Sequence, residues 1–230
     1  MNRTALITGG SGGLGSGVTE TFLAAGWRVV VPWLVESELV RLPQHENLRT
    51  MRADLFEAES TREVVQAAAD DGDAPLRAVV NLVGGFAMHG KVHETDIAEF
   101  EAQLRLNLRP TYLVSQAALP HLLAGDGGSI VCVSSRAALR PFPGAAGYIT
   151  AKAAVLAFVD AMAAEYKQDG IRVNAVLPSV IDTPANREER PGADHTKWVA
   201  PAEIGRVVLF LCEGSSGVVS GAHVPVYGKA

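Results

Sequence analysis

Short runs of apolar, often β-branched residues alternate with longer alanine-rich stretches along most of the chain. Several of the short runs are apolar at every position, which is typical of strands that are covered on both faces. The expected strands span residues 4–8, 28–31, 48–52, 76–81, 129–133, 171–175 and 222–226. The expected helices span residues 13–25, 61–69, 97–123, 145–168 and 201–212. This alternation predicts right-handed βαβ units, and therefore an α/β fold with a mostly parallel sheet.

The length of 230 residues suits one domain, because no repeat, low-complexity tract or linker divides the sequence. Residues 178–200 differ from the rest in being rich in proline, asparagine and charge. A connection of this length inside a compact domain is usually functional, so we expect it to cover the substrate. Asn186 and Arg187 could there contact a polar or acidic substrate, or simply be solvated.

Composition narrows the class of protein. The chain is 48% hydrophobic and 20% charged, which excludes a disordered chain. A formal net charge of -5 argues against nucleic-acid binding, and no apolar run approaches the ~18 residues of a membrane span. Cys132 and Cys212 lie in apolar runs, as buried thiols of a reducing compartment do. Since no targeting segment is visible, we expect a cytoplasmic protein that binds neither nucleic acid nor membrane.

The histidines carry no metal-binding pattern. His89, His93, His121 and His195 have no ligand spacing with cysteines or carboxylates. We therefore expect no metal site.

A glycine-rich turn joins the first expected strand to the first expected helix. Thr8-Gly9-Gly10-Ser11-Gly12-Gly13-Leu14-Gly15 satisfies both G-x-G-x-x-G and the related spacing G-x-x-x-G-x-G. Positions without a Cβ let the backbone approach a pyrophosphate, and the N–H groups and dipole of the helix face the anion. The strand before and the helix after favour dinucleotide binding over a merely structural turn.

The residue that usually determines the preference between NAD and NADP is atypical in this sequence. An acidic residue commonly ends the second strand and holds the ribose hydroxyls. Pro32-Trp33 stands there instead, with Glu36 three residues later. Arg41 is a distant candidate for a 2′-phosphate. The sequence leaves the preference between the two cofactors open.

Two further strand ends carry candidate cofactor contacts. Asp54-Leu55 follows the third strand, and this aspartate could accept from an adenine amino group or cap the next helix. Asn81-Leu82-Val83-Gly84-Gly85 ends the fourth strand. Its glycine pair would let the backbone lie against a cofactor, or form an ordinary turn.

Tyr148 and Lys152 share one face of an expected helix, because they are four residues apart. A phenol ordinarily titrates near ~10, and a neighbouring cation lowers its pKa. Such a pair alone is more often two neighbouring surface side chains than a catalytic site. Ser134 and Ser135 end the fifth strand, however, and the carboxyl ends of parallel strands line the ligand crevice. The combination favours a proton-transfer site.

Together these residues resemble the classical short-chain dehydrogenase/reductase superfamily over essentially the whole chain. The resemblance rests on Thr8-Gly9-x-x-x-Gly13-Leu14-Gly15, Asn81, Asn107, Ser135 thirteen residues before Tyr148, Lys152, Val173-Asn174-Ala175-Val176-Leu177-Pro178 and Thr183. It implies a single-domain, doubly wound Rossmann fold with seven strands and helices on both faces. It also implies a homo-oligomer, with a tetramer favoured over a dimer.

The resemblance implies a role for each catalytic candidate. Tyr148 would give or take the substrate proton, and Ser135 would orient the substrate oxygen. Lys152 would hold the nicotinamide ribose and lower the Tyr148 pKa, while Asn107 would keep a water in the proton relay. The motifs and the resemblance together predict NAD(P) contacts at Thr8, Gly9, Ser11, Gly13, Leu14, Gly15, Trp33, Asp54, Leu55, Asn81, Val83, Gly84, Tyr148, Lys152, Pro178, Val180 and Thr183.

The complete serine, tyrosine and lysine set predicts hydride transfer between NAD(P) and a carbonyl or secondary alcohol. Residues 177–198 and Val83-Gly84-Gly85-Phe86 are also similar to dihydropteridine reductases. Trp33 replaces their acidic residue, and they lack the serine that is present here as Ser135. A pterin- or quinone-type reductase is therefore one alternative. An NAD(P) sensor or structural subunit without turnover is another.

Overall fold

The structure is a computed structural model, and it describes residues 3–125 and 127–229. Seven strands form one sheet in the order β3-β2-β1-β4-β5-β6-β7, and every neighbouring pair is parallel. The strands are β1 (Thr4–Thr8), β2 (Arg28–Trp33), β3 (Leu48–Arg52), β4 (Leu76–Asn81), β5 (Gly128–Val133), β6 (Ile171–Pro178) and β7 (His223–Val226). The order reverses between β1 and β4, which confirms the doubly wound α/β fold.

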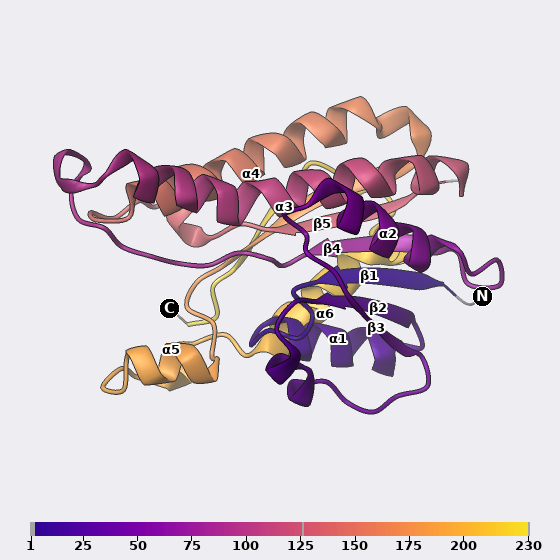
Figure 1. Ribbon diagram of the computed structural model, residues 1–230, viewed down its shortest axis with the longest axis horizontal. Coiled ribbons are helices and arrows are strands. Elements are labelled where there is room, and N and C mark those ends of the chain that lie inside the picture. The colour runs from indigo at the N-terminus through magenta and orange to yellow at the C-terminus, as the bar shows by residue number, and fades with distance from the viewer. Residues whose placement is uncertain (1–2, 126, 230) are drawn as a thin grey trace.

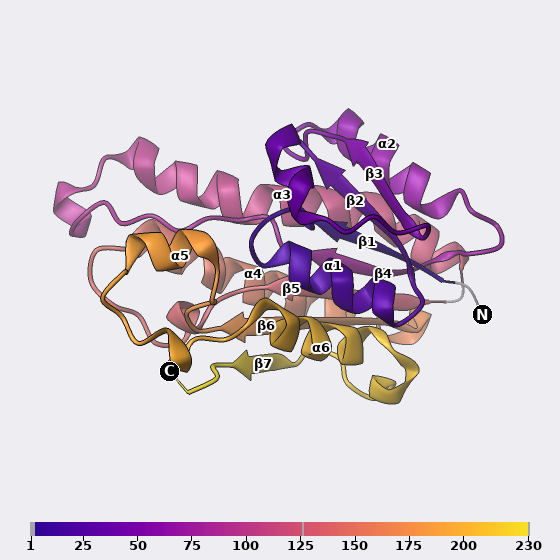
Figure 2. The same ribbon diagram turned by 90° about the horizontal axis from the view of Figure 1, so that it is seen from below.

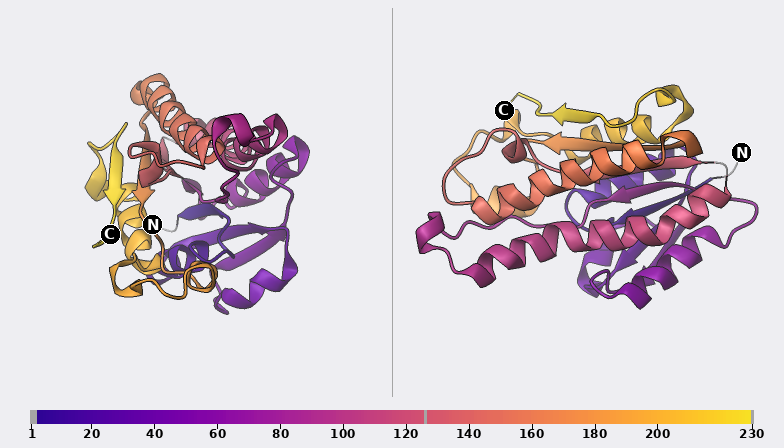
Figure 3. Two further views of the ribbon diagram at one scale, coloured as in Figure 1. Left: turned by 90° about the vertical axis from the view of Figure 1, so that its left-hand side faces the viewer. Right: turned by 90° about the horizontal axis from the view of Figure 1, so that it is seen from above.

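Helices cover both faces of this sheet (Figures 1 and 3). One face carries α1 (Gly15–Ala24) and α6 (Pro201–Cys212), which pack on each other. The opposite face carries α2 (Ala58–Ala69), α3 (Ile97–Ala124) and α4 (Ala146–Glu165). The short helix α5 (Pro184–Glu189) lies apart from both layers, at the end of the sheet toward which the strands point (Figure 2).

The apolar strands supply two cores, one on each face. Ala5 and Ile7 pack with Phe22 of α1 and Ile204 of α6, whereas Leu6 belongs to the cluster under α2, α3 and α4. Successive side chains of a strand point to opposite faces, so a strand covered on both sides must be apolar throughout. This explains why the expected strands have apolar runs rather than alternating ones.

Several element boundaries differ from those predicted. β2 continues to Trp33 and β6 to Pro178, where its last residues pair with β7. α2 begins at Ala58, earlier than the predicted residue 61, and α4 ends at Glu165 instead of 168. The segment 178–200 is not structureless, since it contains α5. Pairing with β3 extends β2, and pairing with β7 extends β6. The local sequence of a strand does not reveal such partners.

By length and composition alone, α4 could cross a membrane. In the fold it packs along α3 and against β6, and it carries the buried Lys152. A helix of the core has the same apolar composition. We therefore assign α4 to the core of the domain.

Candidate active site

The turn between β1 and α1 leaves no room for a side chain at its tightest point. A Cβ on Gly15 would lie 1.9 Å from the Gly9 carbonyl oxygen, and Gly9 has a φ of +67°. The N–H of Gly12 donates to this same oxygen at 3.0 Å. The turn therefore requires glycine, and it places backbone at the start of α1, where an anion is stabilised.

A cavity of about 320 Å³ lies on this turn. The ends of β2, β3 and β4 complete its walls. Of the predicted cofactor contacts, the cavity is lined by Gly9, Ser11, Gly13, Leu14, Gly15, Trp33, Leu55, Val83 and Gly84. Glu38 also lines it. The sequence motifs did not include this residue, because the short 3-10 segment η1 (Glu36–Arg41) reaches the turn only through the fold.

A second cavity of about 540 Å³ continues from the first, sharing Leu14, Leu82 and Gly84 with it. Among the predicted site residues, it is lined by Ser135, Tyr148, Lys152, Pro178 and Val180. The two cavities form one crevice at the carboxyl ends of the strands. Its length and its glycine-lined floor fit an extended dinucleotide, with a substrate beyond it.

Tyr148 and Ser135 meet inside this crevice. Burial raises the pKa of Tyr148 above its ordinary value of 10.0, and a hydrogen bond with the Ser135 side chain acts in the opposite direction. The Ser135 hydroxyl also accepts from the Ala137 N–H at 3.1 Å, which fixes its position. The edge of the Phe86 ring lies against Tyr148, with 5.0 Å between centroids. The site thus holds a neutral phenol, which is a proton donor.

Lys152 lies next to this pair, and only 5% of it is exposed. Its Nζ donates to the Val133 carbonyl at 3.0 Å and lies 5.9 Å from the Tyr148 ring centroid. Burial lowers the pKa of Lys152 to about 8, partly opposed by the Cys132 side chain. The predicted lowering of the Tyr148 pKa by Lys152 is not seen. Burial dominates the tyrosine, and the ammonium is directed at a backbone carbonyl.

Asn107 of α3 fastens the chain that leaves β4. Its Oδ1 accepts from the Gly85 N–H at 3.1 Å, and its Nδ2 donates to the Gly85 carbonyl at 3.0 Å. A Cβ on Gly84 would lie 2.6 Å from this Oδ1 and 3.0 Å from the Lys152 Nζ. The amide therefore positions the floor of the crevice. Its predicted hold on a water stays a prediction.

Two predicted cofactor contacts lie behind the wall of the crevice. The Thr8 hydroxyl accepts from the Leu82 N–H at 3.2 Å and ties β1 to the end of β4. The Asn81 Nδ2 donates to the Ser115 hydroxyl at 3.2 Å and contacts the Cys132 Sγ at 3.7 Å. Its buried Oδ1 has no partner among the residues that the structure describes. Both side chains support the wall rather than line it.

Asp54 and Thr183 also serve the backbone. The Asp54 Oδ1 accepts from the Phe56 N–H at 2.9 Å and closes a turn, while Glu57 is the residue that precedes α2. Asp54 therefore neither lines the cavity nor caps the helix, the two roles considered from the sequence. The Thr183 hydroxyl accepts from the Asn186 N–H at 3.3 Å and caps α5.

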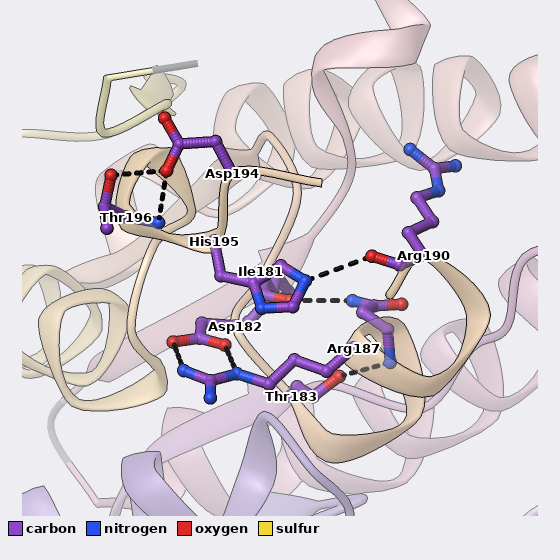
Figure 4. Close-up of polar contacts among 9 residues, drawn as sticks. Ile181, Asp182, Thr183, Arg187, Arg190, Asp194, His195 and Thr196 are labelled. Atoms are coloured by element: carbon purple, nitrogen blue, oxygen red, sulfur yellow. Dashed lines mark hydrogen bonds and ion pairs between the residues drawn. The ribbon is translucent and has the colours of Figure 1, made fainter. Parts of the chain in front are cut away.

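Residues 178–200, here called the lid, border the second cavity through Ser179, Ile181, Asn186, Glu189 and Arg190. Figure 4 shows polar contacts within this segment. Arg187 pairs with Asp182, with 2.7 Å between Nη2 and Oδ2. The Asn186 Nδ2 donates to the Ile181 carbonyl at 2.7 Å, and the His195 Nε2 lies 3.0 Å from the Arg190 carbonyl. Asn186 lines the crevice as the sequence allowed, whereas the pair with Asp182 occupies Arg187.

Replacing Lys152 with methionine should stabilise the protein near neutral pH. The folded-state pKa of about 8 lies below the ordinary 10.5, so the unfolded chain holds this proton more tightly. Wild-type stability therefore gains as pH rises from about 8 to 10.5. Below this range we expect the variant to exceed the wild type by up to about 3 kcal/mol in free energy of unfolding, with the gap closing at higher pH. Urea unfolding across this pH range measures it.

The control is Lys167→Met, because Lys167 is exposed. Its stability should stay parallel to the wild type at every pH. A gap between Lys152→Met and the wild type that does not change with pH would contradict the burial of a charged group at this position.

Comparisons with known proteins agree with this geometry. A family model described as short chain dehydrogenase matches residues 3–194. The 2-(R)-hydroxypropyl-CoM dehydrogenase of Xanthobacter autotrophicus is 32% identical over 99% of this chain and 98% of its own. A probable galactose dehydrogenase, GalD, of Rhizobium meliloti is 34% identical over 92% of this chain and 81% of its own.

Solved structures share the fold over nearly the full length. The structure of ElxO with NADP bound has a TM-score of 0.91 and 25% identity, and covers 99% of this chain and 98% of that one. Another, described as a short chain dehydrogenase/reductase family protein, has a TM-score of 0.87 and 30% identity over 98% of this chain and 96% of that one. The chain belongs to the short-chain dehydrogenase/reductase family of oxidoreductases.

Proposed function

We propose that this protein transfers a hydride between NAD(P) and a carbonyl or secondary alcohol, with Tyr148 giving or taking the proton. The observation that carries the proposal is that Ser135, Tyr148 and Lys152 line one cavity, which adjoins the glycine-lined one. The names of two relatives, a hydroxypropyl-CoM dehydrogenase and a probable galactose dehydrogenase, support alcohol chemistry. NADP bound to ElxO supports the cofactor class. The presence of Ser135 favours this chemistry over pterin reduction.

The protein supplies the proton and the geometry, while a bound nicotinamide supplies or accepts the hydride. The hydroxyls of Ser135 and Tyr148 would hold the substrate oxygen between them. In reduction, this oxygen takes the Tyr148 proton as the carbonyl carbon gains the hydride, and solvent then reprotonates the phenol. Oxidation reverses both transfers. The raised pKa of Tyr148 keeps the phenol protonated before reduction.

Lys152 would act on both the cofactor and the phenol. Its Nζ lies beside Gly84, a residue that lines both cavities. From there it could donate to the nicotinamide ribose. A lysine held in its charged form by such a bond would also stabilise a phenolate at Tyr148.

Removing the phenol hydroxyl tests the catalytic assignment. Tyr148→Phe should lower kcat by about 10²–10⁴-fold, because general acid catalysis contributes that much. Its affinity for NADPH or NADH, measured by calorimetry, should change little. The matched control is Tyr166→Phe near the end of the same helix, which should keep full activity. A panel of ketones, quinones and pterins serves as substrates.

The outcomes separate the alternatives. Equal turnover by Tyr148→Phe and wild type would contradict the role of Tyr148. Preferred reduction of pterins or quinones would favour the second enzyme class. Cofactor binding without turnover by any form of the protein would favour a sensor or structural subunit.

We also infer that the chain forms a homo-oligomer, with a tetramer favoured over a dimer. A mainly apolar groove between α3 and α4 supports a helix-to-helix contact with a second copy. It is lined by Leu104, Leu108, Tyr112, Ala154 and Phe158, together with Arg105 and Arg109. Tyr112 is 47% exposed, and its ring lies 5.5 Å from that of Phe158. Identical subunits related by symmetry would bury this surface on both partners.

A charge placed in this groove should break the assembly. We expect Tyr112→Lys to lower the molar mass measured by light scattering, because an ammonium would be buried beside Arg105 and Arg109 of the same groove. Tyr112→Phe should leave the mass unchanged. A wild-type mass equal to one chain at micromolar concentration would contradict the oligomer.

A further inference from the structure

Three arginines without acidic partners line the second cavity. Arg136 and Arg140 follow β5 and lie four residues apart, and Arg190 follows α5 in the lid. Within residues 3–125 and 127–229, none of their guanidinium groups forms an ion pair or a side-chain hydrogen bond. By contrast, carboxylates pair with Arg3, Arg28, Arg41, Arg62, Arg187 and Arg206.

The charges that line this cavity are mostly positive. Glu189 is the acidic side chain among its lining residues, against the three arginines and Lys152. Arg136 directly follows Ser135, and its guanidinium lies 5.3 Å from the Tyr227 ring centroid, a cation–π contact that leaves its donors free. Figure 4 shows the Arg190 side chain extending away from the polar contacts within the lid.

An apolar wall lies beside the proton donor. Phe86 and Phe142 line the same cavity, with 6.2 Å between their ring centroids, and Phe86 contacts Tyr148. These rings suit a hydrocarbon segment, whereas planar guanidinium groups bind the oxygens of carboxylates, sulfonates and phosphates through paired hydrogen bonds. The cavity therefore offers an apolar wall beside Tyr148 together with three arginines that carboxylates do not occupy.

We propose that the substrate is an oxo acid or hydroxy acid whose anionic group binds between Arg136 and Arg140 on one side and Arg190 of the lid on the other. The carbonyl or hydroxyl group would then lie at Tyr148 and Ser135, with the phenylalanine rings along the connecting carbons. This proposal rests on the proposed function and names its substrate class. It also gives the lid a direct part in selecting the substrate.

The test separates binding from turnover. Calorimetry on Tyr148→Phe loaded with the oxidised cofactor compares 4-oxopentanoate, 3-oxobutane-1-sulfonate and methyl 4-oxopentanoate. The two anions should bind at least about tenfold more tightly than the neutral ester, because charge-assisted hydrogen bonds to arginine hold them. Adding Arg136→Gln or Arg190→Gln to this variant should weaken the binding of the two anions about tenfold. Arg190→Lys should restore part of it, since the charge is kept.

The control is Arg49→Gln, which removes an exposed arginine of β3 outside the crevice. It should leave all three affinities unchanged. Anions that bind no more tightly than the ester, or arginine variants that lose nothing, would overturn the proposal. Neither outcome would affect the assignment of Tyr148, which depends on turnover.

A separate observation concerns the other end of the crevice. The Ser11 hydroxyl in the glycine turn donates to the Glu38 Oε2 at 3.3 Å, and the Arg41 Nη1 donates to the Ser11 carbonyl at 3.3 Å. The same Arg41 nitrogen pairs with the Glu38 Oε1 at 3.0 Å. Glu38 lines the cavity together with Trp33. The end of β2 carries no carboxylate. The Glu38 carboxylate of η1 contacts the glycine turn instead.

We infer that Glu38 accepts a hydrogen bond from the adenosine ribose and makes the protein prefer NAD(H) to NADP(H). A carboxylate accepts from a 2′-hydroxyl but repels a 2′-phosphate. The nearest arginine, Arg41, is already occupied by Glu38 and the Ser11 carbonyl. This inference rests on the dinucleotide binding of the proposed function.

Calorimetric dissociation constants for NADH and NADPH test it without turnover. The wild type should bind NADH at least about tenfold more tightly, the size of one charge-assisted hydrogen bond. Glu38→Gln should move this ratio toward NADPH by about tenfold, and adding Arg41→Gln should reverse the gain in NADPH affinity. Glu36→Gln, in the same turn but outside the cavity, is the control.

An unchanged ratio in Glu38→Gln, or a wild type that prefers NADPH, would overturn the role of Glu38. Failure to bind either dinucleotide would instead contradict the proposed function.

Discussion

The two hydrogen bonds between the Asn107 amide and the Gly85 peptide hold the crevice together. The side chain acts as a neighbouring strand would, satisfying both backbone groups of Gly85 after β4 has ended. Through them α3 fixes Gly84, a residue common to both cavities, against Lys152 of α4. Three elements thus depend on one fully buried amide. Its loss would leave the N–H and the carbonyl of the half-buried Gly85 without these partners.

The fold could be predicted because its determinants are local. Apolar strands and a glycine turn needed no knowledge of partners, and four-residue spacing placed Tyr148 and Lys152 on one helix face. Glu38 and Arg190 lie outside any local motif, since only the folded chain brings η1 to the glycine turn and the lid to the crevice. Asp54 shows the opposite difficulty. An aspartate at the end of a strand can accept a hydrogen bond from a turn N–H as well as from a ligand. Asp54 accepts from the Phe56 N–H and so closes the turn.

Burial acts on Tyr148 and Lys152 in the same sense, because it disfavours charge on either group. The pKa of the phenol rises and that of the amine falls to about 8. The crevice therefore holds its proton on the tyrosine and holds the proton of the lysine weakly. Any charged or polar ligand placed beside them changes this balance for both, so that occupancy of the crevice and its protonation state are coupled.

Most side-chain hydrogen bonds of the lid join lid residues to one another, while the Ser179 hydroxyl donates to the Tyr227 carbonyl at 2.8 Å. Asp182 pairs with Arg187, and backbone carbonyls of the segment accept from its own side chains. Its conformational entropy is thus lost when the chain folds, and the binding free energy of a ligand is not consumed in ordering it. The wall that carries Arg190 is held by contacts within the chain itself, so discrimination among ligands depends on how their charge and shape fit this surface.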